Sequence, residues 1–584
     1  MFRDIAIAIT FSILLSLFVS VAVIPTILNR LYRLPRKNNT RKSAGIIDRI
    51  GNRLHGGLMA LSGFFLKNVV TRLGCVLLFT ALSVAIVWQL MPKTEYLPQG
   101  NQNLVLAILI PTPGSSVDKR QEMGEFFSDQ LAPYLAEDWK DGIPQIEDIW
   151  FVAEEGFNLL GGVSVHDTEA GKLLPLYNRI ANSLPDVFGF AFQAGIFQTD
   201  IASSRTIDVD ITGEDMNQII GAGGQLFGAL MGGIPGSQIR PIPSLETTYP
   251  EARLIPDREK LAASGLTEAA FGTWVDVLMD GRKIDDFRPE GKRQLDLVVK
   301  GPQERSATPE ALLNTAVVNP FGTPIRIGDV ADLVYTRGMT QVNHLERKRH
   351  VRLQVTPPES LPLQAAMETI ENKVVRPMQE AGQLPGVEIT LGGNADKLTQ
   401  TREALQWNFL LAVVITYLLM SALFENFFYP FIIMFTVPLA GAGGFIGLRL
   451  VDAYVAPQGF DVVTMLGFII LVGTVVNNAI LIVHQSLNNV RYGGYTGTAA
   501  ITESVRTRIR PIFMSAATSV FGMLPLAIST GAGSELYRGL GSVLLGGLAL
   551  STMFTLFVVP SLLAFFIGFE KKRKKNPNGT PLAS

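Results

Sequence analysis

Seven long apolar runs without a charged side chain limit what this chain can fold into more than any other feature of its sequence. They cover residues 5–28, 73–91, 404–424, 427–448, 462–487, 511–528 and 539–569. A helix of about 20 residues rises about 30 Å, the thickness of the hydrocarbon core of a bilayer. Core helices of a soluble protein are the alternative, but several uncharged runs of this length are typical of membrane proteins. We therefore predict seven transmembrane helices.

The first run also has the position of a cleavable signal peptide. However, it is longer than the usual apolar region of about 7–15 residues, and Pro25-Thr26-Ile27 offers no small-x-small cleavage site. We expect the run to remain as the first transmembrane helix.

Composition excludes several other classes of protein. The 584 residues carry a net charge of -1, so no overall positive field favours nucleic acid. The single cysteine, Cys75, excludes a disulfide framework and a thiolate metal site. The length itself requires several domains.

Lysine and arginine gather in three places beside the apolar runs. They lie between Arg30 and Arg53, between Arg491 and Arg510, and in the tail segment 571–575. A solvated face or a nucleic-acid patch would also collect such charge, but the positive-inside rule explains all three clusters with one cytoplasmic side. The amino terminus and the segment between residues 91 and 404 are then predicted to lie outside the cytoplasm.

That external segment is polar and long enough for folded domains. It repeats one strand and helix pattern, with strands at 104–110, 146–152, 207–211, 351–355 and 387–391 and helices at 117–135, 216–230 and 363–381. Each repeat is interpreted as a β-α-β unit, and such units joined as split pairs form a ferredoxin-like sandwich.

Two further segments differ from this pattern. Residues 253–345, with a predicted helix at 267–279 and strands at 295–299 and 324–327, are interpreted as an inserted subdomain. Residues 30–68 are predicted to contain an amphipathic helix on the cytoplasmic surface, because Leu54, Leu58, Leu61 and Phe65 recur at helical spacing.

No enzyme motif is present that would identify a reaction. The glycine-rich segment 221–233 lacks the Lys-Ser/Thr of a phosphate loop, and its glycines are interpreted as serving helix packing or flexibility. The five histidines, including His344 and His350, show no metal-ligand spacing, and these two are predicted to line one face of a strand. We expect neither an enzyme nor a metal site.

The fifth apolar run places two amides, Asn477 and Asn478, in the middle of a transmembrane helix. A buried amide without a partner costs about 1–3 kcal/mol, so partners are expected. The two residues lie about 100° apart around the helix and cannot face the same direction. Hydrogen bonding between helices and a polar link in an ion pathway both remain open interpretations.

The next helix begins with a basic segment. Arg508 lies at its cytoplasmic edge, and Ser515 lies two turns further on the same face. Arg508 could serve an ion pathway, or it could reach back to the membrane surface with its long side chain.

The segment GFIILVGTVVNNAILIVHQ and the later segment ESVRTRIRPIFMSAATSVFGMLPLAISTGAGSE closely resemble the tenth and eleventh helices of resistance-nodulation-division (RND) transporters. The resemblance is to the hydrophobe/amphiphile multidrug-efflux branch, that of the acriflavine resistance proteins. The preceding ALFENFFYPFIIMFTVPLAGAGG is similar to the family's passage from the eighth to the ninth helix. The resemblance extends over the whole chain and implies the carboxy-terminal half of a pump.

The resemblance implies a fold class of an α-helical membrane domain with about seven helices and a large α+β periplasmic region. That region would contain porter subdomains of β-α-β type interrupted by a docking subdomain. The implied divisions are a membrane helix (1–34), a cytoplasmic linker (35–72), a second membrane helix (73–92), a first porter subdomain (93–202), a second porter subdomain (203–249 and 349–397), a docking subdomain (250–348), five membrane helices (398–569) and a basic cytoplasmic tail (570–584).

The resemblance also implies partners and an energy source. A homotrimer in the bacterial inner membrane would bind a periplasmic adaptor and an outer-membrane channel, and it would use the proton motive force without a cofactor. An amino-terminal half is a further implied partner if the transporter is split. No nucleic acid is implied as a partner.

The proton-relay positions implied by the resemblance are Asn477, Arg508 and Ser515, with Asn478 as a neighbour. A drug pocket is implied near Gly156 and Phe157. Two departures from the family are present: an uncharged asparagine stands at 477 where the family has a lysine, and no aspartate or glutamate lies inside any apolar run. The implied aspartate pair of the fourth helix has no counterpart in this chain.

The predicted function is therefore half of a proton-driven exporter of hydrophobic and amphiphilic compounds. A membrane-anchored periplasmic scaffold without transport, or an RND relative that moves lipids, are the alternatives.

Overall fold

The computed structural model describes residues 2–33, 46–98, 100–112, 115–154, 157–185, 187–196, 205–245, 249–279, 281–291, 293–302, 308–338, 341–358, 360–495 and 497–573. The chain divides into two compact units, Met1–Lys67 and Asn68–Ser584. Of the predicted basic clusters, residues 34–45 and 574–575 lie outside the described residues.

The first unit is helical. The α-helix α1 (Phe2–Phe18), the π-helical η1 (Val19–Val23) and α2 (Ile24–Arg33) follow one another without a break. The segment Ala6–Arg30 is apolar and long enough to span a membrane, which confirms the first predicted span. The helix α3 (Ile46–Leu66) confirms the helix expected within residues 30–68, and Leu54 and Leu61 are exposed on it. Its location on a membrane surface stays a prediction.

The second unit contains the other six helices long and apolar enough to span a membrane. The elements are α4 (Val69–Leu90), α14 (Asn394–Phe424), α15 (Phe428–Met434), α16 (Thr436–Tyr454), α17 (Val462–Arg491), α18 (Thr498–Ile528) and α19 (Glu535–Arg573), with α15 and α16 together forming one candidate span. α19 packs against α16, α17 and α18. The seven predicted spans are thus confirmed by length and composition.

The ends of these helices differ from the ends of the apolar runs. α14 and α18 begin about three to four turns before the first residue of their runs, because charged residues form helix well and extend it into water. The run at 427–448 is divided near Phe435, because Pro438 has no N–H to bond the carbonyl of Met434. A charge-free stretch therefore marks the apolar depth of a span and not the length of its helix.

Glycines bring α16 and α19 into close contact. A Cβ atom added at Gly443 would lie 2.6 Å from the carbonyl oxygen of Gly546, and one at Gly447 would collide with the carbonyl of Ser542. Small residues that let two backbones approach are a common basis of helix packing in membranes, where lipid removes the hydrophobic driving force. These glycines fix α19 against α16.

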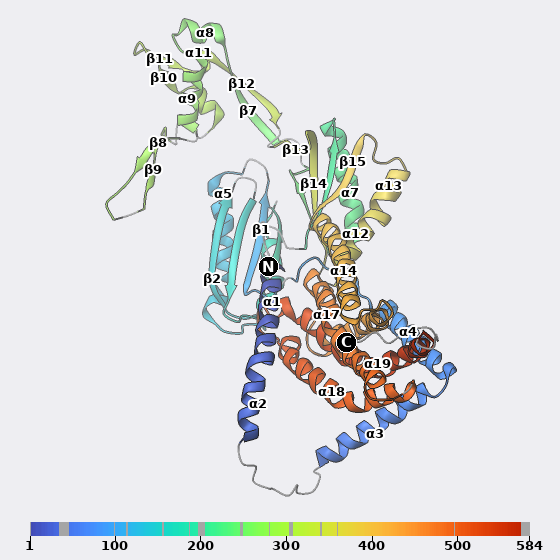
Figure 1. Ribbon diagram of the computed structural model, residues 1–584. Coiled ribbons are helices and arrows are strands. Elements are labelled where there is room, and N and C mark those ends of the chain that lie inside the picture. The colour runs from blue at the N-terminus through green and yellow to red at the C-terminus, as the bar shows by residue number, and fades with distance from the viewer. Residues whose placement is uncertain are drawn as a thin grey trace. The chain divides into compact units, whose positions relative to one another are not determined.

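The first sheet domain has the order of a split β-α-β sandwich (Figure 1). Its elements are β1 (Leu104–Pro111), α5 (Val117–Ala136), β2 (Ile146–Glu154), β3 (Phe157–Ser164), α6 (Leu174–Ala181) and β4 (Val187–Gln193), and the antiparallel sheet runs β2-β3-β1-β4. Phe127 of α5 and Tyr177 of α6 are buried against Val105 and Leu109 of β1. The predicted strand β1, helix α5 and strand β2 are confirmed, while β3, α6 and β4 were not predicted.

The second sheet domain repeats this arrangement. Its elements are β5 (Ile207–Gly213), α7 (Met216–Gly233), β6 (Gln238–Ile242), β14 (Lys348–Thr356), α12 (Leu363–Thr369), the π-helical η4 (Ile370–Val375), α13 (Arg376–Glu380) and β15 (Val387–Gly393). The strands pair in the order β6-β14-β5-β15, and β13 (Asn343–Leu345) also pairs with β14. The glycine-rich segment 221–233 lies within the helix α7, as expected.

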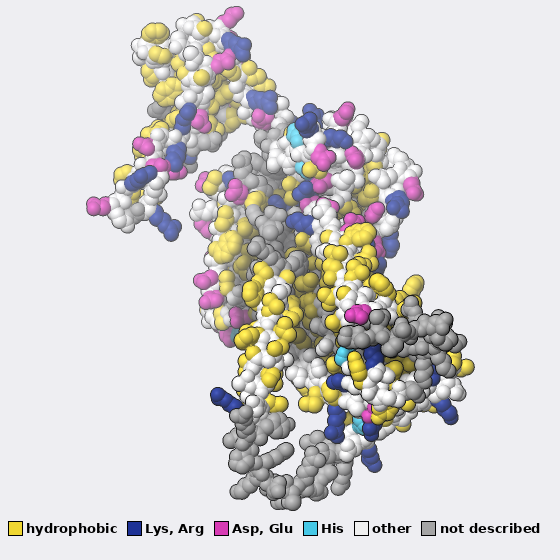
Figure 2. All heavy atoms as spheres, in the orientation of Figure 1, with side chains coloured by type: hydrophobic (Ala, Val, Ile, Leu, Met, Phe, Trp, Pro, Cys, Tyr) yellow, Lys and Arg dark blue, Asp and Glu magenta, His cyan; other side chains and the backbone are white. Residues whose placement is uncertain are grey.

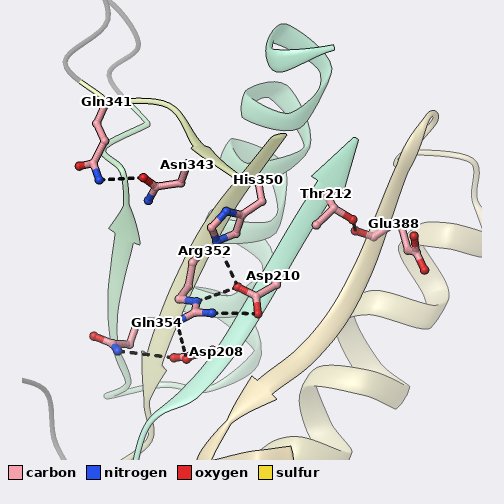
Figure 3. Close-up of polar contacts among 9 residues, drawn as sticks. All are labelled: Asp208, Asp210, Thr212, Gln341, Asn343, His350, Arg352, Gln354 and Glu388. Atoms are coloured by element: carbon pink, nitrogen blue, oxygen red, sulfur yellow. Dashed lines mark hydrogen bonds and ion pairs between the residues drawn. The ribbon is translucent and has the colours of Figure 1, made fainter. Parts of the chain in front are cut away.

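Apolar and charged residues alternate along β5, and the apolar ones mark the face of the sheet that the helices cover. Ile207, Val209 and Ile211 belong to the core formed with α7 and α12, whereas Asp208 and Asp210 point to the opposite face. There they meet Arg352 of β14 (Figure 3).

The insert between β6 and β14 has its own core. It contains β7 (Tyr249–Pro256), α8 (Arg258–Ala263), α9 (Glu268–Met279), β8 (Arg282–Phe287), β9 (Leu295–Val299), α10 (Pro309–Leu313), β10 (Ala316–Val318), β11 (Pro324–Arg326), α11 (Ile327–Val330) and β12 (Ala331–Gly338). Leu261, Phe271 and Ile327 are buried together. The predicted helix at 267–279 and the predicted strands at 295–299 and 324–327 are confirmed.

One histidine prediction was wrong. His344 lies on β13 and His350 on β14, so the two residues do not line one strand. Glu346 and Arg347 between them have positive φ angles of 50° and 69° and form the turn of a hairpin. The sequence has neither glycine nor asparagine there, which are the usual signals of such a turn.

Candidate functional site

The two adjacent asparagines of α17 have different surroundings. Asn478 is 4% exposed, and its Nδ2 donates to Oγ1 of Thr552 on α19 at 3.1 Å. Asn477 is exposed in the described chain. The structure thus places Asn478 as a hydrogen-bonding link between helices, while Asn477, about 100° further around α17, is uncovered.

Arg508 of α18 is half-buried and is held by a neutral side chain. Its Nε donates to Oε1 of Gln485 on α17 at 3.2 Å, and a terminal nitrogen donates to the same oxygen. Gln485 donates in turn to Oδ1 of Asn489 at 2.9 Å, and Asn489 donates to the carbonyl of Ala500 at 3.0 Å. Gln485 was not among the predicted site residues.

Ser515 lies two turns beyond Arg508 on α18 and is exposed. Among the described hydrogen bonds, none joins Asn477, Arg508 and Ser515 to one another. The structure places these residues on two helices that pack together, with Asn477 and Ser515 uncovered on otherwise apolar segments. Their assignment to a proton relay stays a prediction.

A buried polar cluster at the start of α17 was missed by the sequence analysis. Arg538 of α19 is 2% exposed and donates through Nε to Gln458 at 3.0 Å, and Gln458 donates to the carboxylate of Asp461 at 3.4 Å. Asp461 caps α17 by accepting from the backbone N–H of Thr464 at 2.7 Å. Burial raises the pKa of the Asp461 carboxyl, which lies just before the apolar span, to about 7. An aspartate directly before an apolar run is a helix-start signal that could have identified it.

The predicted drug pocket falls at the edge of the described residues. Gly156 lies outside them. Phe157 begins β3 and packs on the apolar outer face of the first sheet, which contains Ile108 and Phe190. The guanidinium of Arg240, on β6 of the second sheet domain, lies 5.4 Å from the centroid of the Phe157 ring. Nε2 of Gln238 also donates to the carbonyl of Ala191 at 3.2 Å, so two contacts join the two sheet domains beside Phe157.

A groove of about 330 Å³ lies where the second sheet domain joins α14. It is lined by Met367, Glu371, Val375, Ile389, Leu391, Ala395, Asp396 and Thr399. Its walls combine apolar side chains with the carboxylates of Asp396 and of Glu371, which is paired with Arg376 at 3.6 Å. Large apolar side chains are exposed further along α14, including Trp407, Leu411, Ile415 and Leu419 (Figure 2). The helix that forms one wall of the groove therefore continues into a surface of exposed apolar side chains.

The outer face of the second sheet carries a compact charged network (Figure 3). Arg352 contacts the carboxylate of Asp210 at 2.7 Å and that of Asp208 at 2.9 Å, and His350 lies 3.7 Å from Asp210. Burial lowers the pKa of His350. The guanidinium of Arg352 therefore lies between two carboxylates on this face of the sheet. Among the described residues, no group of three or more His, Cys, Asp or Glu side chains could hold a metal ion.

The apolar helices and the two split β-α-β domains define a multi-pass membrane protein with a large α+β soluble region. A family model described as the AcrB/AcrD/AcrF family matches residues 1–138 and 167–567. The chain belongs to this family of RND multidrug efflux transporters.

Relatives and a solved structure agree with this assignment. The chain is similar to Multidrug resistance protein MdtC of Salmonella arizonae, with 29% identity over 330 residues that cover 56% of this chain and 31% of that protein. It is 28% identical over 328 residues to MdtC of Yersinia pseudotuberculosis serotype O:1b, again over 56% of this chain and 31% of the relative. The matches to these curated relatives thus span about a third of their length.

The solved structure of a heavy metal efflux pump has a TM-score of 0.70 and 19% identity, and it covers 89% of this chain and 53% of that one. At this identity the likeness shows the fold.

Proposed function

We propose that this chain is the carboxy-terminal half of an inner-membrane RND efflux transporter that exports hydrophobic and amphiphilic compounds at the expense of the proton motive force. The observation that carries the proposal is the pair of uncovered polar positions, Asn477 and Ser515, on the apolar helices α17 and α18 beside Arg508. Polar groups at membrane depth face a partner surface or a water-filled path, because exposure to lipid is costly. A second set of helices with acidic side chains is the surface that would complement Arg508.

The proposed substrate class follows from surfaces outside the apolar runs of the membrane helices. The groove beside α14 combines apolar walls with Glu371 and Asp396, and Phe157 combines an aromatic ring with the cation of Arg240. Such surfaces favour molecules with an apolar body and a polar or charged end. Gly156 and Phe157 remain the proposed pocket residues for these compounds.

The proposed assembly is a homotrimer that contacts a periplasmic adaptor and an outer-membrane channel, with an amino-terminal half completing each protomer. The insert between β6 and β14 supports the docking role, because it has its own core and exposes apolar residues on the hairpin β8–β9, such as Ile284, Phe287 and Leu297. A non-transporting scaffold or a lipid-moving relative is not favoured by membership of a family of multidrug efflux transporters.

The proposed topology is testable with reporters fused to the chain. A reporter after Leu34 or after Lys575 is expected in the cytoplasm, because basic residues flank both positions. A reporter in the segment between residues 91 and 404 is expected outside the cytoplasm. Protection from a protease or a membrane-impermeant label measures both, and an external carboxy-terminal reporter would overturn the assignment.

The proposed relay is testable at Arg508. Arg508→Ala, in the chain co-expressed with an amino-terminal half, is expected to reduce proton-coupled dye efflux by at least about tenfold, since a charge that stabilises coupling by about 1.4 kcal/mol is lost. The matched control is Arg573→Ala at the end of α19, which is expected to leave efflux nearly unchanged. Equal and small effects at both positions would mean that Arg508 only anchors the helix at the membrane surface.

A further inference from the structure

Arg508 is a charged residue of a transmembrane helix, but its side chain donates hydrogen bonds to a neutral residue, Gln485. Both donating nitrogens of Arg508 share one acceptor, the amide oxygen of Gln485. Many other described arginines form a salt bridge with a carboxylate, as Arg506 does with Glu503 at 2.9 Å. None of the salt bridges of the described residues includes Arg508. The guanidinium group of Arg508 is therefore held in one orientation, while its positive charge is not neutralised by a carboxylate.

The orientation of the Gln485 amide is determined by its second contact. Its Nε2 donates to Oδ1 of Asn489 one turn later, and Asn489 is itself fixed because it donates to the backbone carbonyl of Ala500. The amide oxygen of Gln485 must then point to Arg508. The chain of hydrogen bonds leaves α18 at Ala500, follows α17 through Asn489 and Gln485, and returns to α18 at Arg508. A closed path of this kind holds the guanidinium more firmly than a single surface contact would.

The neighbouring charges do not replace this amide. Glu503 is paired with Arg506, and Arg510 is exposed one position beyond the buried Ile509. His484 is exposed on α17 and lies 3.4 Å from the side chain of Asn488. Gln485 is thus the described group that fixes the position of Arg508 without cancelling its charge.

We propose that Gln485 is a positioning residue for Arg508, a neutral tether that keeps the guanidinium aimed and its charge available to a carboxylate of the transport machinery. This role rests on the proposed function, in which Arg508 takes part in proton coupling. A carboxylate at position 485 would form a stronger ion pair with Arg508 and would neutralise its positive charge. An aliphatic side chain at this position would leave the guanidinium without its hydrogen-bond acceptor.

The tether is tested first on the full chain in membranes, independently of transport. Phenylglyoxal reacts with guanidinium groups that are not held in an ion pair or hydrogen bond. Peptide mass spectrometry then distinguishes modification of Arg508 from modification of Arg510. Gln485→Leu is expected to increase the modification of Arg508 by about tenfold or more, as the loss of a hydrogen bond to a charged group predicts, and Gln485→Glu to decrease it. Asn488→Leu is the matched control, an amide one turn away on α17 that is expected to leave the modification unchanged. Equal modification of Arg508 in the wild type, Gln485→Leu and Gln485→Glu would overturn the tether.

The functional consequence is tested by proton-driven ethidium efflux against external pH, with the chain co-expressed with an amino-terminal half. Gln485→Glu is expected to reduce efflux at least about tenfold across the pH range, since its carboxylate occupies Arg508. Gln485→Leu is expected to shift the pH profile with a smaller loss, and Asn488→Leu to match the wild type. If Gln485→Glu exports ethidium as fast as the wild type, the charge of Arg508 does not have to remain unpaired for transport. Absence of efflux by the wild type would contradict the proposed function, and the modification of Arg508 would then still decide whether the tether exists.

Discussion

Expressed by itself in a pump-deficient bacterium, the 584-residue chain should leave drug susceptibility unchanged. Proton coupling requires a group that gains and loses a proton within the membrane. In the described spans of the second unit, the carboxylates lie outside the uncharged apolar runs, as Asp396 on α14, Asp452 on α16 and Glu503 on α18 illustrate. Asp461 lies just before α17 and is committed to capping it, and His484 lies near the other end of that helix. None of these groups lies in the middle of an apolar run.

Minimum inhibitory concentrations of several amphiphilic drugs measure this expectation. Co-expression with an amino-terminal half that supplies an intramembrane aspartate pair is expected to restore resistance, and the same half expressed without this chain is the control. Resistance conferred by the chain alone and abolished by collapsing the proton gradient would show that the coupling site is within these residues.

Much of the fold could be predicted because its strongest signals are local. Uncharged runs identified the membrane helices, and alternation in Ile207–Ile211 and Val351–Val355 identified the central strands of the second sheet. The missed elements carry weaker signals: β3 contains Gly161 and Gly162, and β6 contains Pro241. Glycine and proline lower the strand preference of a segment, and only pairing with a neighbouring strand compensates for it.

The candidate site was less accessible to sequence reasoning, because its contacts depend on how two helices pack. Asn477 and Asn478 stood out as amides in an apolar helix, but which of them turns toward Thr552 depends on the position of α19. Gln485 was missed for the same reason, since it gains its role only from Arg508, 23 residues later. The family resemblance pointed to Asn477, Arg508 and Ser515 but says nothing of a glutamine that holds the arginine.

A buried ion pair of the same long-range kind joins Glu95, between α4 and the first sheet, to Arg205, just before β5. Glu95 and Arg205 approach to 2.8 Å, and their side chains are 16% and 6% exposed. Glu95 also accepts from the backbone N–H of Leu363 at 2.9 Å, and Arg205 donates to the carbonyl of Pro358 at 3.2 Å. The backbone N–H of Glu95 donates to the carbonyl of Phe460, two residues before α17. The pair therefore joins the second sheet domain to the end of a membrane helix.

Replacing Arg205 with Met should destabilise the chain by about 3–5 kcal/mol, because a buried carboxylate at Glu95 is left without its counter-charge. Thermal unfolding in detergent and the rate of tryptic cleavage within the second sheet domain measure the effect. The double variant Glu95→Leu/Arg205→Met should recover much of the loss, since a buried ion pair replaced by apolar residues of similar volume is often nearly neutral. Lys93→Ala is the matched control from the same segment, because its pair with Glu368 at 2.8 Å is about half exposed and contributes little. If Arg205→Met and Lys93→Ala unfold at the same temperature as the wild type, the Glu95 and Arg205 pair does not hold the sheet domain to the membrane helices.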